Sequence, residues 1–394
     1  MKELAVNLKK RGSKGKKIIK NSKAFSSPKG TTGQCDFLLT FFTTILVIFG
    51  VVMVFSASYY YSISREGTPY AYLIKQIVYG AVGFVLMYVM SRFDYHLFRR
   101  YSLIIVLLNI IMLMLLFTPL GTTVNGATRW LRIGISVMPG EIAKFSIIIF
   151  SAVYLSADIN RAKNLSGMLP LLGVVGIFAL LIMKQPNLST AMTLVFIAGG
   201  MMVLAGMPWK YSGTAIGGIV VLALMKGFMG GGYQRARMLS FLDPFAQAQG
   251  DGFQVVQSLL ALGTGGVFGV GLGRSVQKTL YLPEPHTDFI MAIIGEELGL
   301  VGIIGLVVVF MLAVWRCMAI AMDASDRLGM LLAGGVGIMI GIQLIFNIAI
   351  VTSSMPPTGV ALPFISYGGN SLWIFMALMG VVLNVSRQSR KEVK

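Results

Sequence analysis

Long apolar runs separated by short polar segments dominate the chain from residue 37 to residue 385. A helix needs about 20 apolar residues to cross the hydrocarbon core of a bilayer. The fourth run is short, and the eighth is long enough to tilt or to extend beyond the bilayer. The pattern predicts an all-α polytopic membrane protein with ten transmembrane helices, at residues 37–58, 70–90, 101–120, 142–156, 168–184, 188–207, 211–229, 289–320, 328–351 and 371–385.

Composition supports a membrane protein. Of the 394 residues, 56% are hydrophobic and 12% are charged, whereas soluble domains carry about twice that charged fraction. Cys35 and Cys317 are far apart and have no ligand spacing, which argues against a disulfide framework. Only two histidines are present, so the sequence offers no histidine-based metal cluster.

The net charge of +18 arises largely from the ends of the chain. Ten of the 33 Lys and Arg residues lie between Lys2 and Lys29, and we predict that residues 1–36 form a disordered basic tail that contacts anionic lipid. With this tail in the cytoplasm, the inner segments hold 22 basic residues and the outer segments nine. That excess predicts that both termini are cytoplasmic, including a short tail at 388–394. Nucleic-acid binding and a cleaved signal peptide are the weaker interpretations.

Three predicted outer segments are too long to be simple turns. The largest, residues 230–287, is an extracellular loop between helices 7 and 8, with an amphipathic stretch at 253–262 and a glycine-rich run at 263–273. These glycines could allow close backbone approach or re-entry into the membrane, or they could form a flexible connector. For residues 121–144 we predict an interfacial helix or ribbon. In the third segment, residues 353–370, three prolines exclude a regular helix. Ordered loops of this length are usually functional.

Carboxylates inside the segment 281–299, YLPEPHTDFIMAIIGEELG, make it the first candidate for chemistry. Ionisable residues at membrane depth are functional candidates by default. Asp288 follows a proline-containing turn at the outer mouth of the eighth helix, whose N-terminus favours an ionised carboxylate. Glu296 and Glu297 lie roughly 12 Å deeper at 1.5 Å per residue. We therefore expect them to support packing or hydrogen bonding, and Asp288 to be the reactive group.

The predicted outer loops combine carboxylates with basic residues, namely Arg129, Arg132, Arg235, Arg237, Lys144 and Lys278. Arginine and lysine near apolar surface suit a lipid phosphate or pyrophosphate, and a carboxylate among them suits proton abstraction from a hydroxyl. The pattern favours group transfer from a lipid-phosphate donor. A transporter of an anionic lipid would show the same residues, so enzyme and transporter stay open here. The chain has no phosphate-binding GxxxxGK[ST] loop.

Several ordered motifs resemble one family along nearly the whole chain. They are NGATRW (125–130), PGEIAK (139–144), YQRARMLSFLDPF (233–245), GFQVVQSLLALGTGGVFGVGLG (252–273), SVQKTLYLPEPHTDFIMAIIGEELGLVG (275–302) and PPTGVALPFISYGGNSL (356–372). They are similar to the SEDS family of FtsW, RodA and SpoVE, with SVQKTLYLPEPHTDFI closer to the FtsW/SpoVE branch. Three departures are VMPGE at residues 137–141, where QP usually precedes the small residue and the glutamate, Asn187 in QPNLS, where a charge is common, and Asn370 in place of a common serine.

The resemblance implies a ten-helix domain (37–387) that acts as a peptidoglycan glycosyltransferase in the bacterial cytoplasmic membrane. It implies polymerisation of lipid II, the undecaprenyl-pyrophosphate disaccharide pentapeptide. A class B penicillin-binding protein transpeptidase is the implied partner, in a divisome or related cell-wall complex at the septum. The family aspartate falls on Asp288, and the resemblance implies that it acts as general base, or as positioner, for the acceptor sugar's 4-hydroxyl, with undecaprenyl pyrophosphate as the leaving group. The implied substrate-binding residues are Arg129, Glu141, Lys144, Arg237, Lys278, His286 and Ser366.

Some questions stay open at the sequence level. A lipid II flippase and a scaffold that activates the penicillin-binding partner remain the alternatives. No metal-ligating residues are assigned, and a divalent cation, Mg²⁺ or Mn²⁺, is left open as a cofactor. A role in division, sporulation or elongation is not distinguished.

Overall fold

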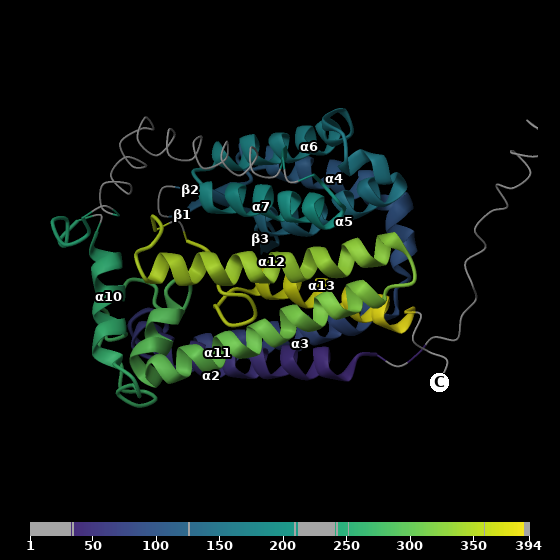
Figure 1. The fold of residues 1–394 in the computed structure, drawn as a ribbon. Helices are drawn as coiled ribbons and strands as arrows, with labels where there is room; N and C mark the ends of the chain where they lie inside the picture. Colours follow the sequence, from purple (N-terminus) through teal and green to yellow (C-terminus); the bar gives the residue numbers. More distant parts are fainter. Residues whose placement is uncertain are drawn as a thin grey trace, which may run out of the picture. The chain divides into compact units, whose positions relative to one another are not determined.

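Helices make up most of the structure. The computed structural model describes residues 33, 35–124, 127–208, 210–211, 241, 243–250, 252–357 and 359–389. The helices, shown in Figure 1, are α2 (Phe37–Glu66), α3 (Ala71–Arg92), α4 (Phe98–Leu115), α5 (Pro139–Ala157), α6 (Leu165–Met183), α7 (Leu188–Leu204), α10 (Phe253–Gly265), α11 (Ile290–Asp323), α12 (Arg327–Val351) and α13 (Gly369–Arg387), with short 3-10 turns at Tyr95–Leu97 and Ile159–Ala162.

Eight of the helices in the described residues are long and apolar enough to cross a membrane, and α7 is a shorter apolar helix. They match nine of the ten spans predicted from the hydrophobic pattern, with ends that differ by up to eight residues, most at the C-terminus of α2. Residues 212–229 of the predicted span at 211–229 lie outside the described residues, as do the tail 1–32, part of the large loop and residues 390–394. The predicted amphipathic stretch forms α10.

The fold is mainly helical, as the hydrophobic pattern predicts, and residues 121–124 and 127–137 add a small sheet. Its strands β1 (Gly121–Val124), β2 (Ala127–Ile133) and β3 (Ile135–Val137) pair antiparallel in that order. Threonine, valine and isoleucine favour extended backbone here. Gly134, with φ of 72°, makes the tight turn between β2 and β3. Of the two alternatives predicted for this segment, the ribbon is confirmed.

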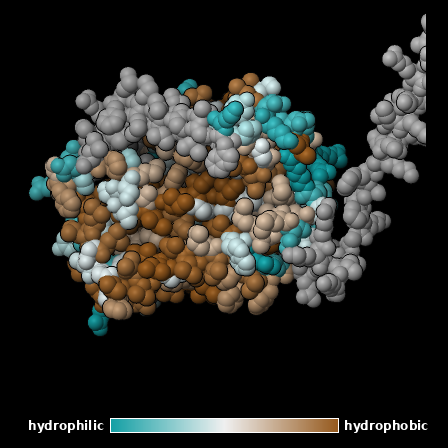
Figure 2. Space-filling view, viewed as in Figure 1, coloured by the Kyte–Doolittle hydropathy of each residue, from teal (hydrophilic) through white to brown (hydrophobic). Residues whose placement is uncertain are grey.

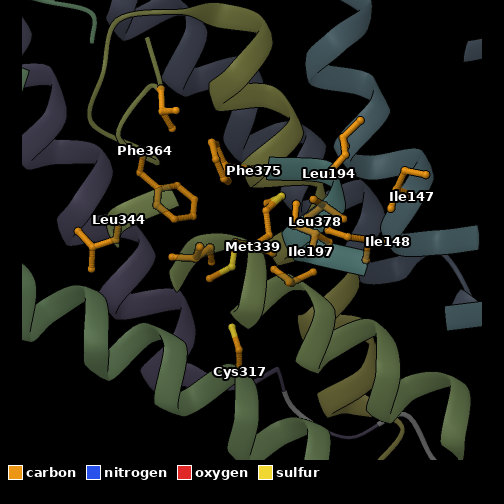
Figure 3. Close-up of a cluster of buried hydrophobic side chains, with 14 of the residues drawn as sticks. Ile147, Ile148, Leu194, Ile197, Cys317, Met339, Leu344, Phe364, Phe375 and Leu378 are labelled. Carbon is orange, nitrogen blue, oxygen red and sulfur yellow. The ribbon is translucent and has the colours of Figure 1, made fainter. Parts of the chain in front are cut away.

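The core lies where α5, α7, α12 and α13 pack together (Figure 3). Ile148 of α5, Leu194 of α7, Met339 of α12 and Leu378 of α13 are fully buried there. The outward faces are also apolar. Ile48 of α2 and Leu180 of α6 are exposed, and hydrophobic residues cover the middle of the face shown in Figure 2. An apolar interior together with an apolar outer surface is typical of a helix bundle solvated by lipid.

The connections at one end of the bundle are the ones that build the site. We call this the loop end; it comprises β1–β3, α10, the loop Gly266–Phe289 and the segment Thr352–Gly368. Helix α10 marks it at the left in Figure 1. Hydrogen bonds tie these parts to the ends of the helices: Ser258 of α10 donates to the carbonyl of Val351 in α12, and Asn370 of α13 donates to the carbonyl of Ser136 in β3. The predicted lack of regular helix in 353–370 is confirmed as far as Gly368 in its described residues.

Polar contacts close the opposite end. Asp326 caps α12 through the N–H of Gly329 and pairs with Arg99 at 2.7 Å. Tyr95 donates to the same carboxylate at 2.9 Å. Burial by itself would raise the pKa of Asp326, but hydrogen bonds from His96, Gly329 and Tyr95 outweigh this effect and lower the pKa to about 2. The loop preceding α4 is thereby tied to the start of α12.

Candidate active site

Asp288 lies two residues before α11 at the loop end, as the sequence predicts. The side-chain amide of Asn347 on α12 donates to its main-chain carbonyl at 3.0 Å, and also to the carbonyl of Val360 at 2.7 Å. Its carboxylate packs on Gly359, where a Cβ atom would lie only 2.7 Å from Oδ2. Asp288 is half-buried. The backbone of Asp288 is therefore held by α12, and its carboxylate lies against the segment that follows α12.

The residues just before Asp288 are fixed by the same segment. Ser366 donates to the carbonyl of Thr287 at 2.7 Å and accepts from the N–H of Leu362 at 2.8 Å. The N–H of Tyr367 donates to the carbonyl of His286 at 2.9 Å. Ser366, which the resemblance places at the substrate, thus also braces the backbone of the turn that carries Asp288.

His286 is enclosed by aromatic side chains. Its ring centroid lies 4.9 Å from that of Tyr61, 4.8 Å from Tyr72 and 5.4 Å from Tyr367, and the residue is 3% exposed. Burial lowers the pKa of His286 to about 4. The imidazole is consequently neutral at physiological pH and packs as an aromatic ring. This burial favours a structural role over the substrate contact expected from the sequence.

Arg129 in β2 is linked to Asp288 through the start of α7. Its guanidinium donates to the carbonyl of Pro186 at 2.7 Å. Asn187 caps α7 by accepting from the N–H of Thr190 at 3.2 Å, and Ser189 donates both to Asn187 and to the carbonyl of Gly359. Gly359 is the residue on which the Asp288 carboxylate rests. Asparagine directly before an apolar helix is a recognisable N-cap signal, so this role of Asn187 could have been predicted from the sequence.

Glu141 and Lys144 form the pair predicted at the start of α5. Lys144 Nζ lies 2.8 Å from Glu141 Oε1, and both side chains are buried. Pro139 occupies the first turn of the helix, where its missing N–H costs nothing. Gly140 lies beside Thr190, so the start of α5 packs against the start of α7. The ion pair therefore supports the same cluster that contains Ser189.

Lys278, Glu296 and Glu297 form a separate buried cluster at the start of α11. Lys278 Nζ is 2.7 Å from Glu297 Oε1 and donates to Ser56 of α2 at 2.9 Å. Lys278 is 2% exposed and both glutamates are fully buried, which favours a bracing role for Lys278 over the expected substrate contact. The prediction that the two glutamates serve hydrogen bonding is confirmed.

Two further predictions have no side-chain geometry to support or oppose them. Arg237 lies outside the described residues. Within the described ranges, no three His, Cys, Asp or Glu side chains come together as a metal site.

The fold and the site define a class: a multi-pass membrane protein in which loops at one end hold a carboxylate on a bundle of apolar helices. The family model described as "Cell cycle protein", FtsW/RodA/SpoVE, matches residues 36–391. The chain belongs to the FtsW/RodA/SpoVE family.

Individual relatives agree with this assignment. The chain is 38% identical to a probable peptidoglycan glycosyltransferase FtsW of Geobacter sp. (strain M18), over 90% of this chain and 97% of the relative. It is 38% identical to stage V sporulation protein E of Bacillus subtilis (strain 168), over 90% and 98%.

Solved structures share the fold. One, described under "Structural coordination of polymerization and crosslinking by a peptidoglycan synthase complex", matches with a TM-score of 0.74 and 25% identity, over 91% of this chain and 99% of that chain. The rod shape determining protein RodA of Thermus thermophilus matches with a TM-score of 0.67 and 25% identity, over 91% and 98%.

Proposed function

We propose that the protein is a peptidoglycan glycosyltransferase that polymerises lipid II, with Asp288 as general base. The observation that carries the proposal is the seating of the Asp288 carboxylate on Gly359 at the loop end. Relatives named as probable peptidoglycan glycosyltransferases cover nearly the whole chain and support the reaction class.

In this mechanism the 4-hydroxyl of the acceptor sugar attacks the anomeric carbon of the donor muramic acid. The bond between that carbon and the pyrophosphate oxygen breaks, undecaprenyl pyrophosphate leaves with the bonding electron pair, and the hydroxyl proton passes to Asp288. Proton abstraction by a positioned base contributes about 10²- to 10⁴-fold in rate. Fixing Asp288 by Asn347 and Gly359 lowers the entropy cost of aligning base and hydroxyl.

Arg129 and Arg237 are proposed contacts for the pyrophosphate, because guanidinium groups bind phosphate oxygens in a bidentate manner. The Glu141–Lys144 pair shapes the site beside α7 and can orient the same charged group. Lys278, His286 and Ser366, which are all buried, are proposed to act on substrate indirectly, by shaping the turn around Asp288.

The basic residues support an orientation with both termini in the cytoplasm and the loop end outside. A lipid-linked donor would then lie in the outer leaflet. The partner we propose is a class B penicillin-binding protein, because polymerisation and crosslinking are coupled in the synthase complex whose structure this chain resembles. Location at the septum within a divisome is part of the same proposal.

The test is polymerisation of purified lipid II by the purified protein, with and without the transpeptidase. We expect Asp288→Ala to reduce glycan-strand formation by about 100-fold or more. The matched control is Glu66→Ala, which removes an exposed carboxylate at the same end, paired with Lys75. Full polymerisation by the Asp288 variant would refute the assignment. Translocation of lipid II in liposomes without polymer would support a flippase instead.

A further inference from the structure

Helix α11 is interrupted at Gly299, where φ is 67° and ψ is −167°. The break separates a first segment, Ile290–Leu298, from the rest of the helix, and Asp288 lies two residues before this segment. In an unbroken α-helix the N–H of residue 300 would donate to the carbonyl of residue 296, and that of 301 to 297. A break at membrane depth must find other partners for these four groups, since unpaired backbone groups are costly there.

The glycine-rich loop after α10 supplies all four partners. The N–H groups of Val270 and Gly271 donate to the carbonyls of Glu296 and Glu297, each at 3.0 Å. The N–H groups of Leu300 and Val301 donate to the carbonyls of Gly266 and Val267, at 3.0 and 3.1 Å. Two intrahelical bonds are therefore replaced by four bonds to residues 266–271, which lie between the two halves of α11.

Glycines on both chains make this approach feasible. A Cβ atom on Gly269 would meet the carbonyl oxygen of Glu297, and one on Gly299 would meet the N–H of Gly269. Gly265, at the end of α10, packs equally closely on the carbonyl of Gly295. Of the alternatives for this run, close backbone approach is the one observed, since a flexible connector would not require glycine at these contacts.

Side chains fasten the next part of the same loop to the same segment. Glu296 accepts hydrogen bonds from the hydroxyl of Ser275 and from the N–H groups of Val276 and Gln277. Glu297 accepts from Lys278 at 2.7 Å and from Ser56. Residues 279–289 then form a loop that contains Asp288 and leads into α11. The ion pair between Lys278 and Glu297 thus joins the start of this loop to the first segment of α11.

We propose that the loop Gly265–Lys278 is the positioning element for Asp288, and that Lys278, Glu296 and Glu297 are positioning residues for the transfer reaction. This inference rests on the proposed function for its catalytic readout. Because of the break at Gly299, the segment Ile290–Leu298 does not have to continue the axis of the rest of α11. The loop then fixes that segment, while Asn347 and Gly359 fix Asp288 itself.

The test compares two alanine substitutions in the same loop. Gly269 and Gly273 have φ of 80° and 77°, so alanine is strained at both, but a Cβ on Gly273 would meet nothing within 4 Å. We expect Gly269→Ala to lose amide-exchange protection in residues 290–301. We also expect its kcat for lipid II to fall about tenfold or more with little change in KM, because small misplacements of a catalytic group are costly. Gly273→Ala should keep both.

A second variant guards against loss of folding in Gly269→Ala. The double substitution Lys278→Met/Glu297→Met removes both charges together, which is far less destabilising than leaving one of them buried alone. We expect its melting temperature to stay close to that of the unmodified protein while kcat remains low at unchanged KM. If the ion pair were purely structural, this double variant would have normal activity as well as normal stability.

The outcomes separate the two proposals. Normal kcat in Gly269→Ala with protection lost would overturn the positioning role, and unchanged protection in that variant would overturn the loop's hold on α11. If the unmodified protein makes no polymer, the proposed function fails. The exchange pattern would still decide whether the loop fixes the segment.

Discussion

Replacing Gly359 by alanine tests whether the seat of Asp288 matters for the reaction. Alanine at φ of 68° is strained by about 1–2 kcal/mol. Its Cβ atom would also lie 2.7 Å from Oδ2 of Asp288, whereas ordinary contacts begin near 3.4 Å. The carboxylate must therefore shift by about 0.7 Å, and displacements near 1 Å can cost about 100-fold in rate.

We expect Gly359→Ala to lower the rate of lipid II polymerisation by about 10- to 100-fold. The matched control is Gly67→Ala at the C-terminus of α2, where φ is 72° and a Cβ atom would meet nothing within 4 Å. Both substitutions introduce similar backbone strain, so the melting temperatures of the two variants in detergent should fall by similar amounts. Equal polymerisation rates for the two variants would refute the argument that Gly359 places the carboxylate.

Three further predictions concern residues around the site. Because His286 is neutral when folded and protonates in the unfolded chain below pH 6.5, the stability of the protein should fall as pH drops from about 6.5 to about 4; between pH 7 and pH 5 the loss should be about 2 kcal/mol. His286→Phe should remove this part of the pH dependence, measured by thermal unfolding at both pH values, and an identical pH dependence would contradict the assignment. Ser366→Ala leaves the carbonyl of Thr287 without its donor and should cost about 1–3 kcal/mol; unaltered unfolding of this variant would mean that the turn is held by other contacts. Lys144→Met leaves Glu141 buried without its cation and should destabilise by about 3–5 kcal/mol, with recovery in the double variant Glu141→Leu/Lys144→Met; an equally low melting temperature in the double variant would argue against the ion-pair explanation.

The sequence by itself determined the membrane class and most helix positions. A helix that crosses lipid needs a long apolar run, and such a run can be recognised without knowledge of tertiary contacts. It also indicated Asp288 as the candidate reactive group, because a carboxylate beside an apolar helix stands out in a membrane protein. It predicted the pair Glu141–Lys144 as well, because a spacing of three is a local contact in a helix. The break at Gly299 was not predicted, since an isolated glycine in an apolar run is ordinary.

Tertiary structure decided what surrounds Asp288. Gly359 and Asn347 reach it from segments 59 or more residues away in the chain, and no local pattern encodes that approach. The same holds for Lys278: its sequence position suggested an outer basic residue, but folding places it against Glu297 and Ser56 in the interior. Burial depends on how the whole chain packs. Only the tertiary structure therefore separates the side chains that can contact substrate from the buried side chains that position them.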